Sequence, residues 1–258
     1  MSTLAQLVIH DRSGDAGGGA GGESGCVADN GFCPSWIVDH FDRYLHPFWQ
    51  HVYLSVIAVV AGFLIAFGLA LLAHRRHWLV GPIIGITGVL YTLPSIAVFF
   101  LLQPITGRGA LTALIALTAY TLLILFRNII TGLANVPVDV IDAARGLGFT
   151  DRQVLWRVEL PLALPEIIAG LRIAATTTVG LATLAFFAGA GGLGGEIFAD
   201  ITFKSNVVTA GVLCLLLAIA FDVVLLAIQR LLTPWMRALP IERRRRFMLW
   251  RTNEAVTA

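Results

Sequence analysis

The sequence carries little charge. Of its 258 residues only 13% are Asp, Glu, Lys or Arg and 57% are hydrophobic, whereas about 25% of the residues in a soluble domain are charged. This composition excludes an ordinary soluble domain and indicates a chain embedded in a lipid bilayer. Each membrane-spanning helix needs roughly 20 apolar residues, so the length suits about five spans with their loops. The net charge of +2 gives no sign of a nucleic-acid partner.

Lysine is almost absent. The one lysine, Lys204, does not follow a G-x-x-x-x-G sequence, so the chain lacks a phosphate-binding P-loop. The sequence GAGGLG at 189–194 formally matches the dinucleotide fingerprint G-x-G-x-x-G. However, an uncharged apolar run precedes it where that fingerprint needs a strand. We therefore expect a tight turn there, no enzymatic activity and no cofactor in this chain.

Cysteine is scarce as well. Cys26 and Cys33 lie near the N-terminus and Cys214 lies in an apolar run. Three cysteines at this spacing do not assemble a four-ligand zinc site, so we expect no metal centre. Cys26 and Cys33 can form a disulfide or remain two free thiols.

Five long apolar runs predict membrane-spanning helices. They occupy residues 52–73, 79–103, 110–133, 167–188 and 207–232. The first run has no charge, and at about 1.5 Å per residue it is long enough to cross a bilayer. The expected fold is therefore an all-α integral membrane protein with five transmembrane helices.

The flanking regions differ in composition. Residues 1–50 form an N-terminal region with a Gly-rich linker at 14–25, and residues 32–49 mix aromatic with charged side chains. That mixture is compatible with an amphipathic helix at a membrane surface or with an ordinary packed lead-in helix. Residues 51–235 form the transmembrane domain, and 236–258 form a basic tail.

Arginine is distributed unevenly between alternate loops. The loop after the first run, the central loop and the tail hold most of the arginines outside the spans, whereas the other connecting segments hold three arginines and Lys204. The positive-inside rule then places the N-terminus outside and the C-terminus in the cytoplasm of a multi-pass cell-membrane protein. Cys26 and Cys33 would face an oxidising compartment, which favours the disulfide.

The central loop, residues 135–165, has the local pattern of two helices. Asn135 is a candidate N-cap, Gly146 and Gly148 are typical helix stops, and Thr150 with Gln153 forms a capping-box pattern. Pro161 and Pro165 are expected to end the second helix. Apolar residues at helical spacing predict one buried or docked face of the first helix: Val136, Val140, Ile141, Ala144 and Leu147.

The same loop resembles a known motif. Permeases of ATP-binding-cassette importers carry a cytoplasmic loop with the pattern E-A-A-x3-G-x9-I-x-L-P. This sequence has Asp142-Ala143-Ala144, three residues, Gly148, nine residues, and then Val158-Glu159-Leu160-Pro161. The spacing matches throughout, and the departures are Asp for Glu and Val for Ile. The chain thus resembles a permease of the type I importer class.

This resemblance implies a mechanical role for the loop, which would dock into a groove on a separate ATPase. The implied coupling residues are Asp142, Ala143, Ala144, Arg145, Gly148, Val158, Leu160 and Pro161. For Asp142, a polar contact with the ATPase and a local ion pair with Arg145 both remain open. The implied partners are two cytoplasmic ATP-binding subunits that bind ATP and Mg²⁺, a second permease, identical or paralogous, and an extracytoplasmic substrate-binding protein.

Four further stretches narrow the resemblance. LPSIAVFFLL (93–102), FRNIITGL (126–133), residues 143–174 and FAGAGGLG (187–194) resemble permeases that import glycine betaine, carnitine, choline or proline. The match covers about residues 50–235. It implies the uptake of a small osmoprotectant.

Asp222 lies within the last apolar run, where an ionisable residue is costly and commonly functional. We expect it to pair with Arg172, Arg127 or Arg230, as a structural pair rather than as a substrate contact. Small and weakly polar residues also recur at helical spacing in two runs and either pack helices or line a path. The candidate path residues are Thr92, Ser95, Phe99, Thr176, Thr183 and Phe187.

Two alternatives remain open. A permease of the same superfamily could carry another small polar solute, such as an amino acid. An ion-coupled secondary transporter would require inverted repeats and carboxylates near the middle of the membrane. The sequence shows no repeat, and only Asp222 lies near that depth.

Overall fold

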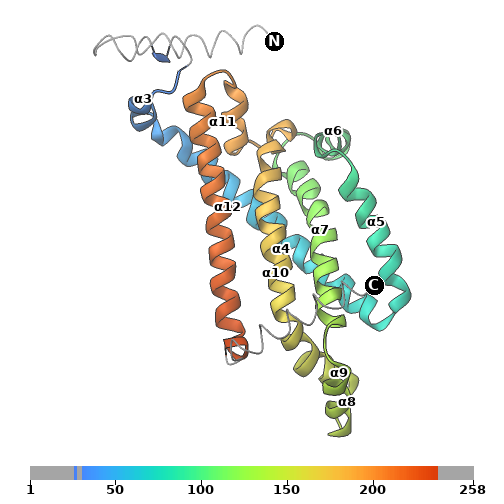
Figure 1. The fold of residues 1–258 in the computed structure, drawn as a ribbon. Helices are drawn as coiled ribbons and strands as arrows, with labels where there is room; N and C mark the ends of the chain where they lie inside the picture. The colour runs from blue at the N-terminus through green and yellow to red at the C-terminus, as the bar shows by residue number, and fades with distance from the viewer. Residues whose placement is uncertain (1–25, 28–30, 238–258) are drawn as a thin grey trace, which may run out of the picture. The chain divides into compact units, whose positions relative to one another are not determined.

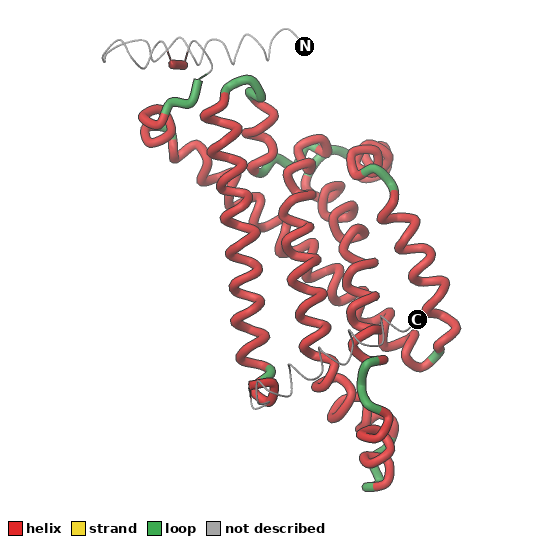
Figure 2. Tube along the Cα trace, viewed as in Figure 1, coloured by secondary structure: helices red, strands yellow, loops and turns green. Residues whose placement is uncertain are grey.

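The computed structural model describes residues 26–27 and 31–237. The expected Gly-rich linker at 14–25 and nearly all of the expected basic tail lie outside the described residues. Every regular element within the described part is helical (Figures 1 and 2). Four helical segments are long and apolar enough to cross a membrane: Phe41–Arg75, Ala110–Ala134, Asp151–Ala188 and Lys204–Leu232. The all-α membrane fold is therefore confirmed.

The chain divides into two compact units, and each unit contains parts of the same long helices. Unit 1 comprises residues 1–57, 94–117 and 179–218, and unit 2 comprises residues 58–93, 118–178 and 219–258. The boundaries fall inside α4 (Leu45–Arg75), α7 (Ala110–Ala134), α10 (Leu160–Ala182) and α12 (Lys204–Leu232). The two units are described separately below.

Unit 2 has an apolar core of small and branched residues from α4, α7 and α10. Ala66, Ala70 and Ala73 recur at three- and four-residue steps on α4 and are fully buried. They pack in one cluster with Phe126 of α7 and Ile167 of α10, among others. Small residues let helices approach closely where lipid offers no hydrophobic driving force between them.

Close helix approach in unit 2 is evident at Gly170 of α10 and at Gly62 of α4, which faces Thr121 of α7. A Cβ atom at Gly170 would lie 2.3 Å from Cβ of Asn128 on α7, and one at Gly132 would lie 3.1 Å from the carbonyl oxygen of Ala163. A Cβ atom would overlap Asn128 at Gly170, and at Gly132 it would require its neighbours to shift by a few tenths of an ångström. The glycines therefore set the spacing of α7 and α10.

Unit 1 contains α3 (Pro34–Asp39), a 3₁₀ turn η1 (Phe41–Tyr44), the start of α4, α6 (Ser95–Thr106), η4 (Thr183–Ala188), α11 (Leu193–Ala199) and the start of α12. The lead-in segment is not one continuous amphipathic helix, because the chain leaves the α conformation at His40. Tyr44 is 1% exposed and Trp36 packs edge-on against Phe203. Of the two alternatives, these contacts favour a packed lead-in.

The predicted span at 79–103 is wrong as a continuous helix. It consists of α5 (Val80–Thr92, 13 residues) and α6 (12 residues), separated by Leu93 and Pro94 with ψ angles of 139° and 125°. Pro94 lacks a backbone N–H and forces the preceding residue into an extended conformation, so the helix breaks there. A fifth span exists only if this bent pair counts as one.

Two further boundaries differ from expectation. The first helix of the central loop, α8 (Val138–Gly146), is preceded by Pro137 as its N-cap rather than by Asn135. Pro161 and Pro165 do not end the second helix, which continues into α10. A π turn at Leu155–Glu159 precedes Pro161, and such local π adjustments re-satisfy backbone groups that proline leaves unpaired. The connection between the predicted spans at 167–188 and 207–232 contains the expected turn, in which Gly189, Gly191 and Gly192 have positive φ, and also α11 (Leu193–Ala199).

Candidate coupling site

The central loop forms a two-helix elbow, residues 135–165, at one end of α7 and α10 in unit 2 (Figure 1). Its corner is a Schellman motif. The N–H of Phe149 donates to the carbonyl of Ala144 (3.2 Å), and that of Gly148 donates to the carbonyl of Arg145 (2.9 Å). Gly148 has φ of 84°, a conformation that side chains with a Cβ disfavour. The glycine of the motif is thus required by the shape of the corner.

The second arm of the elbow starts at a reciprocal cap. Thr150 precedes α9 (Asp151–Val154), and its N–H donates to Oε1 of Gln153 (2.8 Å). The expected capping box is present. Helical structure then runs through the π turn into α10. A displacement of the corner would therefore be transmitted directly to a membrane-spanning helix.

The elbow separates an anchored side from an outward side. Ala144, Val154, Leu155 and Leu160 are buried, the last two in the core of unit 2. Leu147 is 79% exposed and belongs to the outward side, so the predicted single face that included it with Ala144 is divided. The division arises because Leu147 is the C-cap, where the chain has left the helical path.

The outward side combines apolar and charged groups. Val138 and Val140 are exposed together with Asp142 and Ala143. Arg145 pairs with Asp151 at 3.4 Å rather than with Asp142. Asp142 is thus left without an ion pair among the residues that the structure describes. An exposed apolar patch with a charge is typical of a protein-docking surface.

The I-x-L-P part of the motif has a different environment. Leu160 joins the core of unit 2. Val158 and Pro161 instead line an open pocket of about 270 Å³, together with Arg157, Leu162 and Trp235. Within the motif, Leu160 thus anchors the chain in the core, whereas Val158 and Pro161 remain accessible at the pocket.

A contact that sequence reasoning missed ties the elbow to α4. Glu159, which is buried and occupies the unspecified position of the motif, lies with Oε2 2.9 Å from Nε2 of His74. Trp156 also packs against Phe67, with ring centroids 6.4 Å apart. A charged residue between two apolar ones at 158–160 was the available signal, but its partner lies far away in the sequence.

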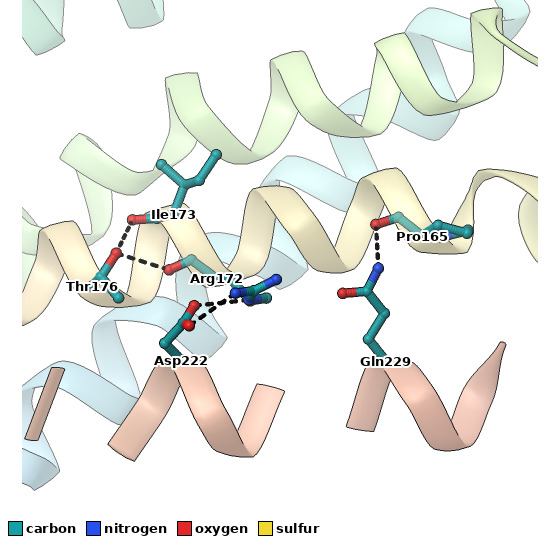
Figure 3. A network of polar contacts seen from close by, with 6 residues as sticks. All are labelled: Pro165, Arg172, Ile173, Thr176, Asp222 and Gln229. Atoms are coloured by element: carbon teal, nitrogen blue, oxygen red, sulfur yellow. Dashed lines mark hydrogen bonds and ion pairs between the residues drawn. The ribbon is translucent and has the colours of Figure 1, made fainter. Parts of the chain in front are cut away.

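Within unit 2, the structure pairs Asp222 with Arg172, as Figure 3 shows. Nε and Nη2 of Arg172 donate to Oδ1 and Oδ2 of Asp222, each at 2.8 Å. Of the other two candidates, Arg127 is exposed on α7 and has no ion pair within the described part of the chain, and Arg230 lies on the same helix as Asp222. A bidentate pair of this kind is the strongest hydrogen-bonded geometry available to a carboxylate and an arginine.

The candidate path residues do not form the two expected stripes. Thr92 and Ser95 flank the break between α5 and α6, and Phe99 is fully buried. Thr92 donates its hydroxyl proton to the carbonyl of Val89. Their role in translocation stays a prediction.

The second set of path residues is divided in the same way. Thr176 lies in unit 2, and its hydroxyl is within hydrogen-bond distance of the carbonyls of Arg172 and Ile173. Thr183 and Phe187 lie in the 3₁₀ turn η4 of unit 1, which has a different residue period from α10. The role of these residues in translocation also stays a prediction.

At the other end of the chain, Cys26 and Cys33 form a disulfide. The N–H of Cys33 donates to Oγ of Ser205 (2.7 Å), and that hydroxyl donates to the carbonyl of Gly31 (3.1 Å). The bridge therefore lies beside the start of α12 within unit 1.

Known proteins are similar to this chain in sequence and in fold. The family model described as "Binding-protein-dependent transport system inner membrane component" matches residues 49–238. The choline transport system permease protein OpuBB of Bacillus subtilis is 38% identical over 192 residues, or 74% of this chain and 88% of that protein. The osmoprotectant import permease protein OsmW of Salmonella typhimurium is 38% identical, covering 72% and 90% of the two chains.

Solved structures show the same fold at lower identity. The inward-facing MetNI methionine ABC transporter matches with a TM-score of 0.61 at 22% identity, over 71% of this chain and 95% of that one. An amino acid ABC transporter with histidines matches with a TM-score of 0.61 at 18% identity, over 76% and 97%. The chain therefore belongs to the family of inner-membrane components of binding-protein-dependent transport systems and has the type I ABC importer permease fold.

Proposed function

We propose that this permease imports a small osmoprotectant, namely glycine betaine, carnitine, choline or proline, and is driven through its elbow by a separate cytoplasmic ATPase. The names of the relatives support the solute class, since OpuBB is a choline permease and a second Bacillus subtilis relative, 36% identical, is a glycine betaine/carnitine/choline permease. ATP and Mg²⁺ are bound by the partner and not by this chain.

The observation that carries the coupling role is the elbow. Its corner needs Gly148 for backbone reasons, its inner side is anchored in the core of unit 2, and its outer side presents Leu147 and Asp142. Val138, Val140 and Leu147 together give this side an exposed apolar surface, and burying a side chain such as Leu147 against a partner stabilises by about 2 kcal/mol. The ATPase would cover this surface.

The assembly that we propose contains two ATPases, two permeases, identical or paralogous, and an extracytoplasmic binding protein. The N-terminus lies outside and the C-terminus lies in the cytoplasm. The Cys26–Cys33 disulfide supports this orientation, because such bonds persist in oxidising compartments. Arginine-rich segments at the elbow and the tail support it independently.

The test is uptake by cells that lack their own osmoprotectant systems and express this permease with its ATPase and binding protein. We expect saturable uptake of at least one of labelled glycine betaine, carnitine, choline and proline. Uptake of an amino acid alone would replace the proposed solute. Uptake that persists when the ATPase is inactive would instead indicate an ion-coupled carrier.

The coupling surface has its own test in the same complex. Leu147→Glu places a charge on the outer side of the elbow, and we expect loss of the ATPase on purification in detergent. Arg152→Glu, on the exposed second arm of the elbow, is the matched control. Retention of the ATPase by Leu147→Glu would contradict the docking role.

A further inference from the structure

The seam between α10 and α12 in unit 2 is polar. Arg172 pairs with Asp222, and the side-chain amide of Gln229 donates to the carbonyl of Pro165 at 3.4 Å (Figure 3). The two contacts lie seven residues apart on each helix, at 165 and 172 on α10 and at 229 and 222 on α12. This opposite order is expected for antiparallel neighbours. No residue of α12 belongs to the described apolar core cluster of unit 2. The C-terminal half of α12, which belongs to unit 2, is thus held to α10 by polar side chains. Their hydrogen bonds can be replaced by bonds to another molecule.

The pair lies deep within apolar segments. Asp222 lies ten residues before the end of α12 at Leu232, or about 15 Å along a helix. Arg172 lies near the middle of α10 (Leu160–Ala182). Charged groups at such depth normally face a water-filled cavity or another polar group, because exposure to hydrocarbon is costly.

The pair is also accessible. The Arg172 side chain is 28% exposed and that of Asp222 is 37% exposed. The rest of this chain therefore leaves one side of the pair uncovered. The accessible side presents the guanidinium of Arg172 next to the carboxylate of Asp222, and the two charges neutralise each other.

We propose that Arg172 and Asp222 form an intramembrane binding site for a zwitterionic quaternary ammonium solute. The guanidinium of Arg172 receives the carboxylate of the solute, and the carboxylate of Asp222 receives its ammonium group. In the empty state the two side chains neutralise each other. This inference rests on the proposed function and adds to it a place in the membrane where the solute is recognised.

The site makes a distinction between solutes that a purely structural pair would not make. Glycine betaine and carnitine carry both a carboxylate and a quaternary ammonium group, whereas choline carries only the cation. Arg172 is therefore needed for the zwitterions and is dispensable for choline. Asp222 is needed for both kinds of solute.

The experiment measures uptake of labelled glycine betaine and choline in parallel, by the complete transporter, normalised to the amount of assembled complex. Arg172→Gln should lower betaine uptake at least about tenfold more than choline uptake, the scale of one lost charge-assisted contact. Asp222→Asn should lower the uptake of both. Arg127→Gln, which removes an arginine of the same unit that has no described ion pair, should leave the ratio unchanged.

The double variant Arg172→Gln/Asp222→Asn separates recognition from structure. Replacing both members of an intramembrane ion pair is milder than removing one, which leaves a lone charge, so a structural pair predicts recovery of betaine uptake. A recognition site predicts that betaine uptake stays lost. If Arg172→Gln fails to assemble, this double variant decides, and retained betaine uptake overturns the proposal.

The remaining outcomes are also informative. Equal losses of betaine and choline uptake in Arg172→Gln overturn the site. A wild-type transporter that imports choline but no zwitterion overturns it too, while leaving osmoprotectant import intact. A wild-type transporter that imports neither solute refutes the proposed function itself.

Discussion

In unit 1, the lead-in segment is fixed to α11 and to the start of α12 by directional side-chain bonds. The hydroxyl of Tyr44 donates to Oδ1 of Asn206 (2.6 Å), and Arg43 pairs with Glu196 at 2.6 Å. In unit 2, α4, α7 and α10 instead meet through alanines and through Gly170. Directional bonds tolerate small changes of volume, whereas close backbone packing does not. The comparison therefore predicts that the lead-in contacts of unit 1 and the α7–α10 packing of unit 2 differ in their sensitivity to mutation.

The largest effect is expected for Gly170→Ala. The new Cβ would overlap the side chain of Asn128 on α7, and overpacking of this kind costs about 3 kcal/mol or more when backbone must move. Thermal unfolding of the complex in detergent measures the loss. Gly68→Ala on α4 is the control, since no atom lies within 4 Å of its Cβ position. Equal stability of the two variants would show that α7 and α10 are not closely packed.

The next effect concerns the link between the elbow and α4. His74→Leu leaves the buried carboxylate of Glu159 unpaired, and we expect a cost of about 2–3 kcal/mol. Glu159→Leu should cost less, because the imidazole left behind is more exposed than the carboxylate of Glu159. Unfolding midpoints of the two variants test this order. A larger loss of stability for Glu159→Leu than for His74→Leu would mean that His74 does not stabilise the buried carboxylate of Glu159.

The same His74→Leu variant separates stability from coupling. If the pair transmits force from the elbow to α4, the number of ATP molecules hydrolysed per solute imported should rise. His74→Lys supplies a cationic donor that can reach Glu159 and should restore the ratio. A ratio that is unchanged in both variants would confine the contact to a stabilising role.

In unit 1 a smaller effect is expected for Tyr44→Phe. The substitution keeps the ring buried and removes one hydrogen bond, which leaves Oδ1 of the buried Asn206 unsatisfied and costs about 1–2 kcal/mol. Tyr53→Phe, at an exposed ring, is the matched control. A loss as large as that of Gly170→Ala would remove the contrast between the two units.

Local signals predicted the elbow well. Gly148 as a helix stop and the Thr150–Gln153 cap depend on residues within six positions, and both are present. The outward position of Leu147 was missed because the register of a face changes where a helix ends. The break at Pro94 was also missed, since proline is tolerated in many membrane helices and only the surrounding structure decides whether it breaks one.

Long-range partners were predictable only as sets of alternatives. Asp222 required a cation, but the choice of Arg172 over Arg127 depends on which faces of α10 and α7 point toward α12. The His74–Glu159 pair gave no comparable signal, because both residues lie at span ends, where charge is ordinary. The π turn at Leu155–Glu159 has no composition of its own.

The smallest loss of stability is expected for the exposed ion pair within the elbow. Arg145 and Asp151 form an ion pair at 3.4 Å, but their side chains are 57% and 90% exposed, and pairs of this kind contribute little. Asp151→Asn should therefore change the free energy of unfolding by less than about 0.5 kcal/mol, in contrast to His74→Leu, although both disrupt an ion pair of the same structural unit. Unfolding at two salt concentrations checks the reason, because only an exposed pair weakens appreciably with added salt. A substantial, salt-independent loss for Asp151→Asn would mean that Asp151 is needed as a first-turn carboxylate of α9, and that the corner is stabilised through its cap rather than through Gly148 and the core beneath it.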